Sequence, residues 1–213
     1  MNHSFSGNKE TLFKTLAENT SDLICIHAPD GTYLYVSPSS KILLGYEPDE
    51  LIGINPYIHF HPDDMERIRS ESHSKSLDGE AIQSITYRIR KKNGEYVWFE
   101  TMTKPVTDES GDVRHLVTTS RDISDRVAML AELEDSRREL AVRNRISEAF
   151  LISSDDSSLQ TVLDIALEEL ESPFGFLGYI DKNGDLVCPT MTHEIWDKCR
   201  MENKEIVFPK SKW

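Results

Sequence analysis

The pattern of apolar and polar positions changes its character twice along the chain. Residues 11–124 alternate short apolar runs with Gly, Pro and Asp, which is typical of strands separated by turns. Residues 125–153 contain neither Gly nor Pro, which favours one long helix. The mixed pattern returns in residues 154–213. After a polar leader at residues 1–10, the chain therefore divides into these three zones.

The first zone predicts an α+β domain on one five-stranded antiparallel sheet. Pro29-Asp30-Gly31 and Asn93-Gly94 are turn signatures that join pairs of strands into hairpins. Pro62 suits the first position of a longer helix. Helices are expected at 9–19, 38–44, 48–51 and 62–77, and strands at 22–28, 32–36, 83–90, 96–106 and 113–123.

Alternation within each predicted strand places one face of the sheet against the short helices. We expect the indole of Trp98 in this core, where its replacement by Ala would cost roughly 3–5 kcal/mol. The full expected core is Leu23 to Ile26, Tyr35, Leu44, Ile58, Tyr87, Ile89, Trp98, and either Leu116 or Val117.

Several short motifs, in this order and spacing, make the first zone resemble a PAS domain. They are Asp30-Gly31, Gly45-Tyr46, Glu50-Leu51-Ile52-Gly53, His61-Pro62-Asp63-Asp64, Asn93-Gly94, Trp98 and Arg121-Asp122-Ile123-Ser124. The resemblance implies a PAS fold and a sensory, dimerising module of signal transduction. It places a ligand pocket inside the domain, with candidate residues Ile58, Phe60, Tyr87, Ile89, Trp98, Val117 and Thr119.

The helix expected at 125–153 carries a heptad pattern with polar interruptions. Such a seam favours a parallel homodimeric coiled coil, because inner polar residues set register at a cost in stability. The alternative is an amphipathic helix packed on its own domain. We expect Asp122, Ile123 and Arg126 to transmit a signal into this helix, with an Asp122–Arg126 contact at the junction. The two lines of the seam are Ile123, Leu130, Arg137, Asn144 and Leu151, and Leu133, Leu140 and Ser147.

The third zone resembles the opening of a GAF domain from multi-domain sensor histidine kinases, many of them archaeal. An apolar helical face from Leu159 to Leu170 precedes two strands, at 174–180 and 186–188. The motifs that carry the resemblance are Gly178-Tyr179-Ile180-Asp181, Gly184-Asp185-Leu186, Trp196-Asp197-Lys198-Cys199 and Phe208-Pro209. Residues 154–213 would make less than half of a GAF domain, so we expect an incomplete one.

The net charge and the composition of the chain disfavour some classes of binding partner. The chain has 24 Lys and Arg against 37 Asp and Glu, a net charge of −13, which disfavours nucleic acid and anionic membrane surfaces as partners. No apolar run approaches the ~20 residues of a membrane-spanning helix, and the N-terminus lacks the apolar segment of a secretory signal. Three cysteines without a CxxC pair favour a reducing, cytoplasmic location.

The sequence offers few residues that could catalyse a reaction or ligate a metal. The sequence contains no phosphate-binding loop, nucleophile elbow or HExxH motif, and no phosphoacceptor or ATP-binding motif of a histidine kinase, so we expect no catalytic activity. His61, Asp63 and Asp64 are interpreted as the opening of a helix whose free N–H groups the carboxylates satisfy. The candidates for metal or haem ligation are His73, Cys188, His193 and Cys199, each with an ordinary structural alternative.

Light-driven flavin adducts are not expected. The PAS subclass that forms them needs a cysteine in an Asn-Cys-Arg motif, and the corresponding stretch, 53–57, contains none. Together these observations predict the sensory input region of a two-component sensor histidine kinase that signals to downstream kinase or response-regulator modules. The alternative is a constitutive PAS dimerisation scaffold without a ligand.

Overall fold

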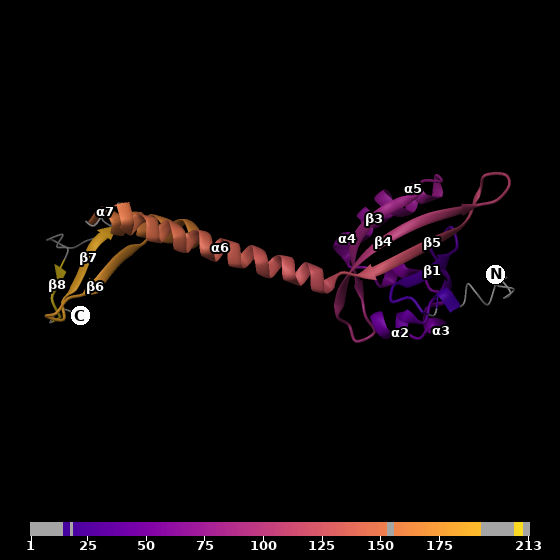
Figure 1. The fold of residues 1–213 in the computed structure, drawn as a ribbon, viewed down its shortest axis with the longest axis horizontal. Coiled ribbons are helices and arrows are strands. Elements are labelled where there is room, and N and C mark those ends of the chain that lie inside the picture. The colour runs from indigo at the N-terminus through magenta and orange to yellow at the C-terminus, as the bar shows by residue number, and fades with distance from the viewer. Residues whose placement is uncertain (1–14, 18, 153–155, 193–206, 211–213) are drawn as a thin grey trace, which may run out of the picture. The chain divides into compact units, whose positions relative to one another are not determined.

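The computed structural model describes residues 15–17, 19–152, 156–192 and 207–210 (Figure 1). The chain divides into two compact units, Met1–Leu130 and Ala131–Trp213. Of the helix expected at 9–19, residues 15–17 are helical and residues 9–14 and 18 lie outside the described part. None of the described helices is long and apolar enough to cross a lipid bilayer.

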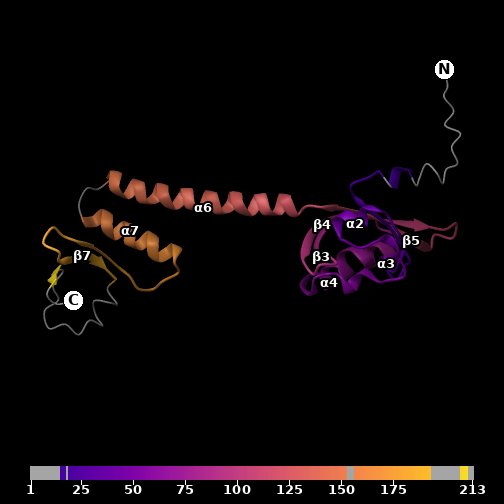
Figure 2. The ribbon, with the colours of Figure 1, turned by 90° about the horizontal axis from the view of Figure 1, so that it is seen from below.

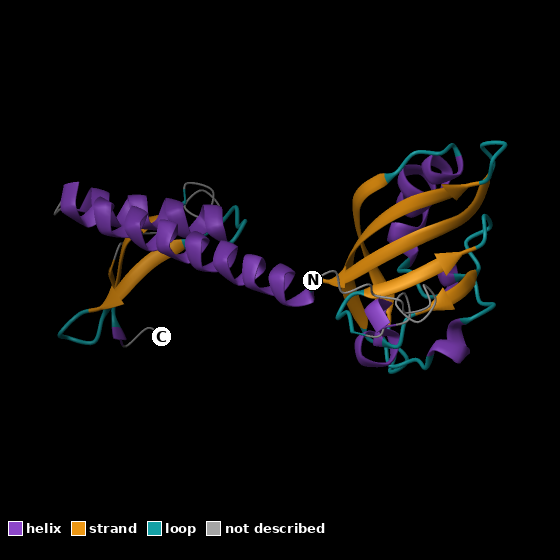
Figure 3. Cartoon of the chain, turned by 45° about the vertical axis from the view of Figure 1, so that its right-hand side comes forward, coloured by secondary structure: helices purple, strands orange, loops and turns teal. Residues whose placement is uncertain are grey.

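The first unit is built on a five-stranded antiparallel sheet with the order β2-β1-β5-β4-β3. This is the α+β sheet that the sequence predicted, and Figure 3 shows the strands with the helices of the unit packed beside them. The pairing of β1 with β5 joins the β1–β2 hairpin to the antiparallel strands β3, β4 and β5. The strands are β1 (Leu23–His27), β2 (Tyr33–Val36), β3 (Ile82–Arg90), β4 (Tyr96–Thr107) and β5 (Val113–Asp122).

Short helices connect β2 to β3 (Figure 2). The helix expected at 62–77 is interrupted, because a π-helical turn separates two α-helical segments. Pro62 opens this run as expected, and the His61 side chain accepts a hydrogen bond from the backbone N–H of Asp63 at 3.3 Å. The segments are α2 (Ser39–Leu43), α3 (Pro48–Leu51), η1 (Pro56–Ile58), α4 (Pro62–Ile68), η2 (Arg69–His73) and α5 (Ser74–Leu77).

The hydrophobic core contains Leu23, Leu44, Tyr87 and Ile89 as predicted, together with the completely buried Phe99. Leu116 is buried as well. The alternative of Leu116 or Val117 is therefore met by Leu116. Three predictions of core residues were wrong, since Ile58 is exposed and Tyr35 and Trp98 are only partly buried. Ile24 and Ile26, inside the predicted run from Leu23, are also only partly buried.

The errors on the strands have two causes. Side chains alternate between the two faces of a sheet, and on β4 the buried residues include Val97 and Phe99, which leaves Trp98 on the outer face. On β2 the buried residues are Tyr33 and Val36, because an irregularity in the pairing with β1 interrupts the alternation and leaves Tyr35 only partly buried.

The helix predicted at 125–153 is present as α6 (Ser124–Ile152), which begins in the first unit and continues into the second. The leucines of the predicted seam are exposed along it, with Leu133 56% and Leu140 52% accessible to solvent. Ile123, the first seam position, is instead buried. In a single chain α6 therefore presents a row of uncovered leucines.

The second unit contains α7 (Asp156–Glu169) and a three-stranded sheet with the order β6-β7-β8. Its strands are β6 (Phe176–Ile180), β7 (Leu186–Met191) and β8 (Val207–Phe208). Within this unit Arg138 on α6 donates to the Glu169 carboxylate on α7 at 3.0 Å. Cys188 is buried in β7, while His193 and Cys199 lie outside the described residues.

Candidate ligand cavity

A cavity of about 70 Å³ lies inside the first unit, between the sheet and the helices. At ~10–15 Å³ for each water-sized occupant, it is large enough for about five of them. The residues that line it come from all five strands of the sheet on one side and from η1, α4 and η2 on the other. Most of the wall is apolar, formed by Leu23, Phe60, Ile68, Ile85, Ile89 and Leu116.

Three hydroxyl groups, contributed by neighbouring strands, form a connected polar edge that we call the hydroxyl row. Thr101 Oγ1 on β4 lies 2.9 Å from Tyr87 OH and 2.7 Å from Ser120 Oγ. The single hydroxyl hydrogen of Thr101 cannot serve both contacts, so at least one neighbour donates to it. All three residues line the cavity, and their hydroxyls can rotate to donate to or accept from an occupant.

His27, at the end of β1, is a buried histidine that lines the same cavity. Its Nδ1 lies 2.8 Å from the carbonyl oxygen of Gly31, and its Nε2 lies 3.0 Å from the hydroxyl of Thr118. A carbonyl can only accept, so Nδ1 carries the proton and Nε2 of the neutral ring accepts from Thr118. Burial lowers the pKa of His27 to about 4, although the Gly31 hydrogen bond opposes this. His27 is therefore uncharged at neutral pH.

Cys25 is the cysteine of β1, and its side chain also lines the cavity. Burial raises the pKa of its thiol to about 12, against a smaller lowering by a hydrogen bond with Thr118. Thiols react as thiolates, so Cys25 is an inert apolar group at neutral pH. In the stretch 53–57, which lacks the cysteine of the flavin-binding motif, Asn55 caps η1 by accepting from the Tyr57 N–H at 3.1 Å.

His73 stands at the edge of the cavity, on the π-helical turn η2. Its Nε2 lies 2.8 Å from the carbonyl oxygen of Pro29, and its Nδ1 lies 3.2 Å from Tyr57 OH. The ring therefore ties the helical layer to the turn between β1 and β2. Throughout the described residues, no group of three or more His, Cys, Asp or Glu side chains is placed to hold a metal ion.

The predicted pocket residues fall into two groups. Phe60, Tyr87 and Ile89 line the cavity, whereas Ile58, Trp98, Val117 and Thr119 do not. Val117 and Thr119 alternate on β5 with the cavity residues Leu116, Thr118 and Ser120, so they lie on the opposite face. The sequence does contain a signal of this polar inner wall. Polar residues stand at every second position on two strands, in the pairs Thr101 with Thr103 and Thr118 with Ser120.

Asp64 differs from its expected role as a simple helix-opening residue. Its carboxylate accepts from the backbone N–H and the Nε of Arg88, both at 2.9 Å, and from Arg88 Nη2 at 3.1 Å. These hydrogen bonds with Arg88 lower the pKa of Asp64. The Arg88 guanidinium also lies over the Trp98 ring, 5.3 Å from its centroid, on the outer face of the sheet. Asp64 therefore fastens α4 to β3.

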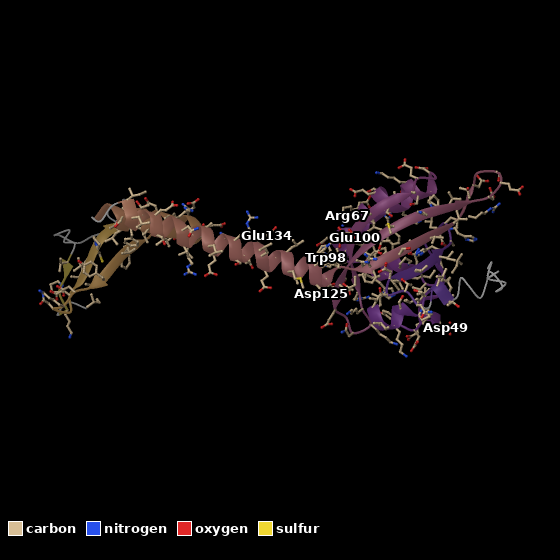
Figure 4. All side chains as sticks on the ribbon, viewed as in Figure 1. Asp49, Arg67, Trp98, Glu100, Asp125 and Glu134 are labelled. Carbon is tan, nitrogen blue, oxygen red and sulfur yellow. The ribbon has the colours of Figure 1, made fainter. Side chains whose placement is uncertain are left out.

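The start of α6 is attached to β4. The Ile123 N–H donates to the Trp98 carbonyl at 2.8 Å, and the Trp98 N–H donates to Ser124 Oγ at 3.0 Å. Figure 4 shows Trp98 and Glu100 close to the first turn of α6, where Asp125 is labelled.

The predicted Asp122–Arg126 contact is not the one that the structure shows. Asp122 accepts from the Ser124 N–H at 2.8 Å, and Arg126 donates to the Glu100 carboxylate at 3.3 Å. Asp122 caps the backbone of the helix start, while Arg126 reaches the neighbouring strand. The side-chain contact at this junction therefore joins α6 to β4.

Residues 33–120 match a family model described as the PAS fold. The chain is 35% identical over 108 residues to an aryl hydrocarbon receptor nuclear translocator homolog from Drosophila melanogaster, covering 49% of this chain and 16% of that protein. It is 30% identical over 127 residues to a blue-light-activated histidine kinase from Brucella canis, covering 57% of this chain and 25% of that protein. The chain thus spans a quarter or less of the length of these curated relatives.

A solved PAS domain from Colwellia psychrerythraea has the same fold. It superimposes with a TM-score of 0.51 at 23% identity, over 55% of this chain and 99% of that structure. Residues 33–120, which match the PAS fold, contain most of the residues that line the cavity.

Proposed function

Because this chain contains a PAS domain, we propose that it is the sensory input region of a signal-transduction protein, in which the cavity binds a small ligand and α6 transmits the response. The observation that carries the proposal is the position of β4. Thr101 on this strand lines the cavity, and Trp98 and Glu100 on the same strand hold the start of α6. A change at the cavity wall therefore reaches the helix through one strand.

The transmission needs only two arrangements of the junction that differ by a few kcal/mol. An occupant that hydrogen-bonds to Thr101 competes with the contacts of Thr101 to Tyr87 and Ser120. A small shift of β4 then changes the Trp98–Ser124 and Glu100–Arg126 contacts, which set the direction of the first turn of α6. The ligand shifts the equilibrium by as much as its affinities for the two arrangements differ.

We propose that α6 pairs with its copy in a parallel homodimer. Leu130, Leu133 and Leu140 are more than half exposed on one chain, and a second copy is the partner that the heptad spacing fits. Asn144 at an inner position can hydrogen-bond its symmetry mate only in a parallel, in-register pair.

The output proposed for the full protein is phosphorelay signalling in the cytoplasm, through a histidine kinase domain or its response regulators. The support is the 30% identity to a blue-light-activated histidine kinase. The GAF-like motifs of residues 154–213 agree with the same class of multi-domain sensor.

A constitutive dimerisation scaffold without a ligand is the second candidate. Its support is the hydroxyl row itself, whose members already hydrogen-bond to one another and so do not require an occupant. The mass and absorbance spectra of the purified protein separate the two functions. A sensor is expected to release a stoichiometric small molecule on denaturation. If protein purified from its native host and from a heterologous host contains no bound small molecule in either case, the scaffold function is favoured.

The pairing of α6 is tested by Leu133→Asp combined with Leu140→Asp. Placing like charges across the seam is expected to weaken dimerisation by about 100-fold or more, because four carboxylates would be buried together. Sedimentation velocity over a concentration series measures the change, and circular dichroism checks that the fold is intact.

The matched control is Ala128→Asp combined with Ala131→Asp, which adds the same charges at exposed helix positions outside the seam. This control is expected to dimerise like the parent. If the seam variant remains as dimeric as the control, another surface holds the dimer and the proposed route through α6 fails.

A further inference from the structure

The wall of the cavity contains no formally charged side chain. Among the described residues that line it there is no Asp, Glu, Lys or Arg. A charged group of a ligand would have to leave water without meeting an opposite charge. The free-energy cost of burying an unpaired charge is far greater than that of burying an amide or hydroxyl group with a partner.

The ring nitrogens of the two imidazoles in the wall already have partners. Burial keeps His27 neutral, with its pKa lowered to about 4, and its two ring nitrogens already contact Gly31 and Thr118. Both ring nitrogens of His73 are likewise engaged, by Pro29 and Tyr57. A carboxylate would have to break one of these contacts to find a donor.

The polar groups that remain available are neutral and lie mainly on the sheet. Thr101 is buried, and its hydroxyl links Tyr87 to Ser120 along the hydroxyl row. The facing wall is mostly aliphatic and aromatic, with Ile68 on α4, and its hydroxyl group, Ser72 on η2, already contacts a threonine of the sheet. The cavity thus has a hydrogen-bonding edge on the sheet and a mainly apolar side opposite it.

We propose that the cavity selects an uncharged, amphipathic ligand of ~5–7 non-hydrogen atoms, bound with its polar edge on the hydroxyl row, and that it rejects carboxylates and ammonium ions of the same shape. The inference rests on the proposed sensory function and gives the chemical class of its ligand. Small alcohols, amides, phenols and neutral heteroaromatic rings belong to this class.

Isosteric pairs of probes test the selection against charge. Propionamide and propionate have the same shape and differ in charge, and they are titrated into the whole 213-residue chain. The readout is the methyl NMR spectrum of its isoleucines. Ile68, Ile85 and Ile89 line the cavity, whereas Ile24 and Ile42 do not and serve as internal references. Propionamide is expected to shift the cavity methyl groups and to bind at least about tenfold more tightly than propionate.

A second pair tests the polar edge. Phenol and toluene have nearly the same shape, but only phenol can hydrogen-bond to the row. Thr101→Val is expected to weaken phenol binding by about fivefold or more and to leave toluene binding unchanged. Thr119→Val, on the outer face of β5, is the matched control and is expected to change neither. Tyr87→Phe is the second test of the row, should the Thr101 variant fail to fold.

The outcomes separate the ligand class from the sensory function. Equal binding of propionate and propionamide, or equal effects of the Thr101 and Thr119 variants, would overturn the proposed selectivity while leaving an occupied cavity and the sensory function intact. If none of the four probes shifts the cavity methyl groups, the cavity does not admit ligands, and both the selectivity and ligand sensing are wrong.

Discussion

Replacement of Phe99 by Ala is expected to lower the free energy of unfolding by about 3–5 kcal/mol, measured by urea or thermal denaturation. Phe99 has 0% of its surface exposed and lies in the hydrophobic core of the first unit. Its ring also packs against Tyr87, with the ring centroids 6.5 Å apart. The loss therefore combines lost burial, a cavity that the backbone cannot close, and one aromatic contact.

Trp98→Ala is the matched control, because the two aromatic residues are neighbours on β4 but face opposite sides of the sheet. The sequence alone predicted a loss of roughly 3–5 kcal/mol at Trp98. Because Trp98 lies on the outer face, we now expect about 1 kcal/mol there, mainly from the contact with Arg88. If Trp98→Ala destabilises the protein as much as Phe99→Ala, the face assignment of β4 is wrong.

Acidification is expected to remove roughly 3 kcal/mol of stability through His27 alone. Its pKa is about 4 in the folded state and 6.5 in the unfolded chain. The unfolded state therefore binds a proton below pH 6.5, which the folded state does not bind until about pH 4. The contribution is present above pH 6.5 and is lost as the pH falls to 4, at about 1.4 kcal/mol per pH unit.

Carboxylates also titrate in this range, so the comparison is made between variants. Urea denaturation of the parent and of His27→Gln at pH 7.5 and pH 4.5 isolates the contribution of His27 to stability. His115→Gln on β5 controls for the loss of an exposed imidazole. The stability difference between parent and His27→Gln is expected to shrink by roughly 2–3 kcal/mol at the lower pH. An NMR titration that shows His27 protonating near pH 6.5 in the folded parent would contradict the argument, whether or not the variant folds.

The order of elements in the first unit was predictable from the sequence because turns and helix starts are local. Pro29-Asp30-Gly31 and Asn93-Gly94 stand where hairpins turn, and Pro62 opens α4. The π-helical turn at 69–73 was missed, since a single widened turn leaves the composition of the helix unchanged.

The candidate site was only partly predictable. Large apolar residues such as Phe60, Tyr87 and Ile89 were named correctly as lining residues, because size and hydrophobicity suggest burial. The hydroxyl row was missed because Thr101 and Ser120 are ordinary surface residues in most proteins. Their role depends on register between β4 and β5, where Thr101 pairs with Ser120, and register is a non-local property.

The alternation of inward and outward side chains along β4 also restricts the length of this strand. The side chains of Phe99 and Thr101 point to the core and cavity, while the Glu100 carboxylate between them, on the other face, holds Arg126 of α6. Deletion or insertion of one residue between Phe99 and Thr101 would turn one of these two side chains to the opposite face, so that either the core or the cavity wall would lose a member. Changes in length within this part of β4 are therefore tolerable only two residues at a time, whereas the exposed turn at Ser110-Gly111 lies beyond this stretch and can change by single residues.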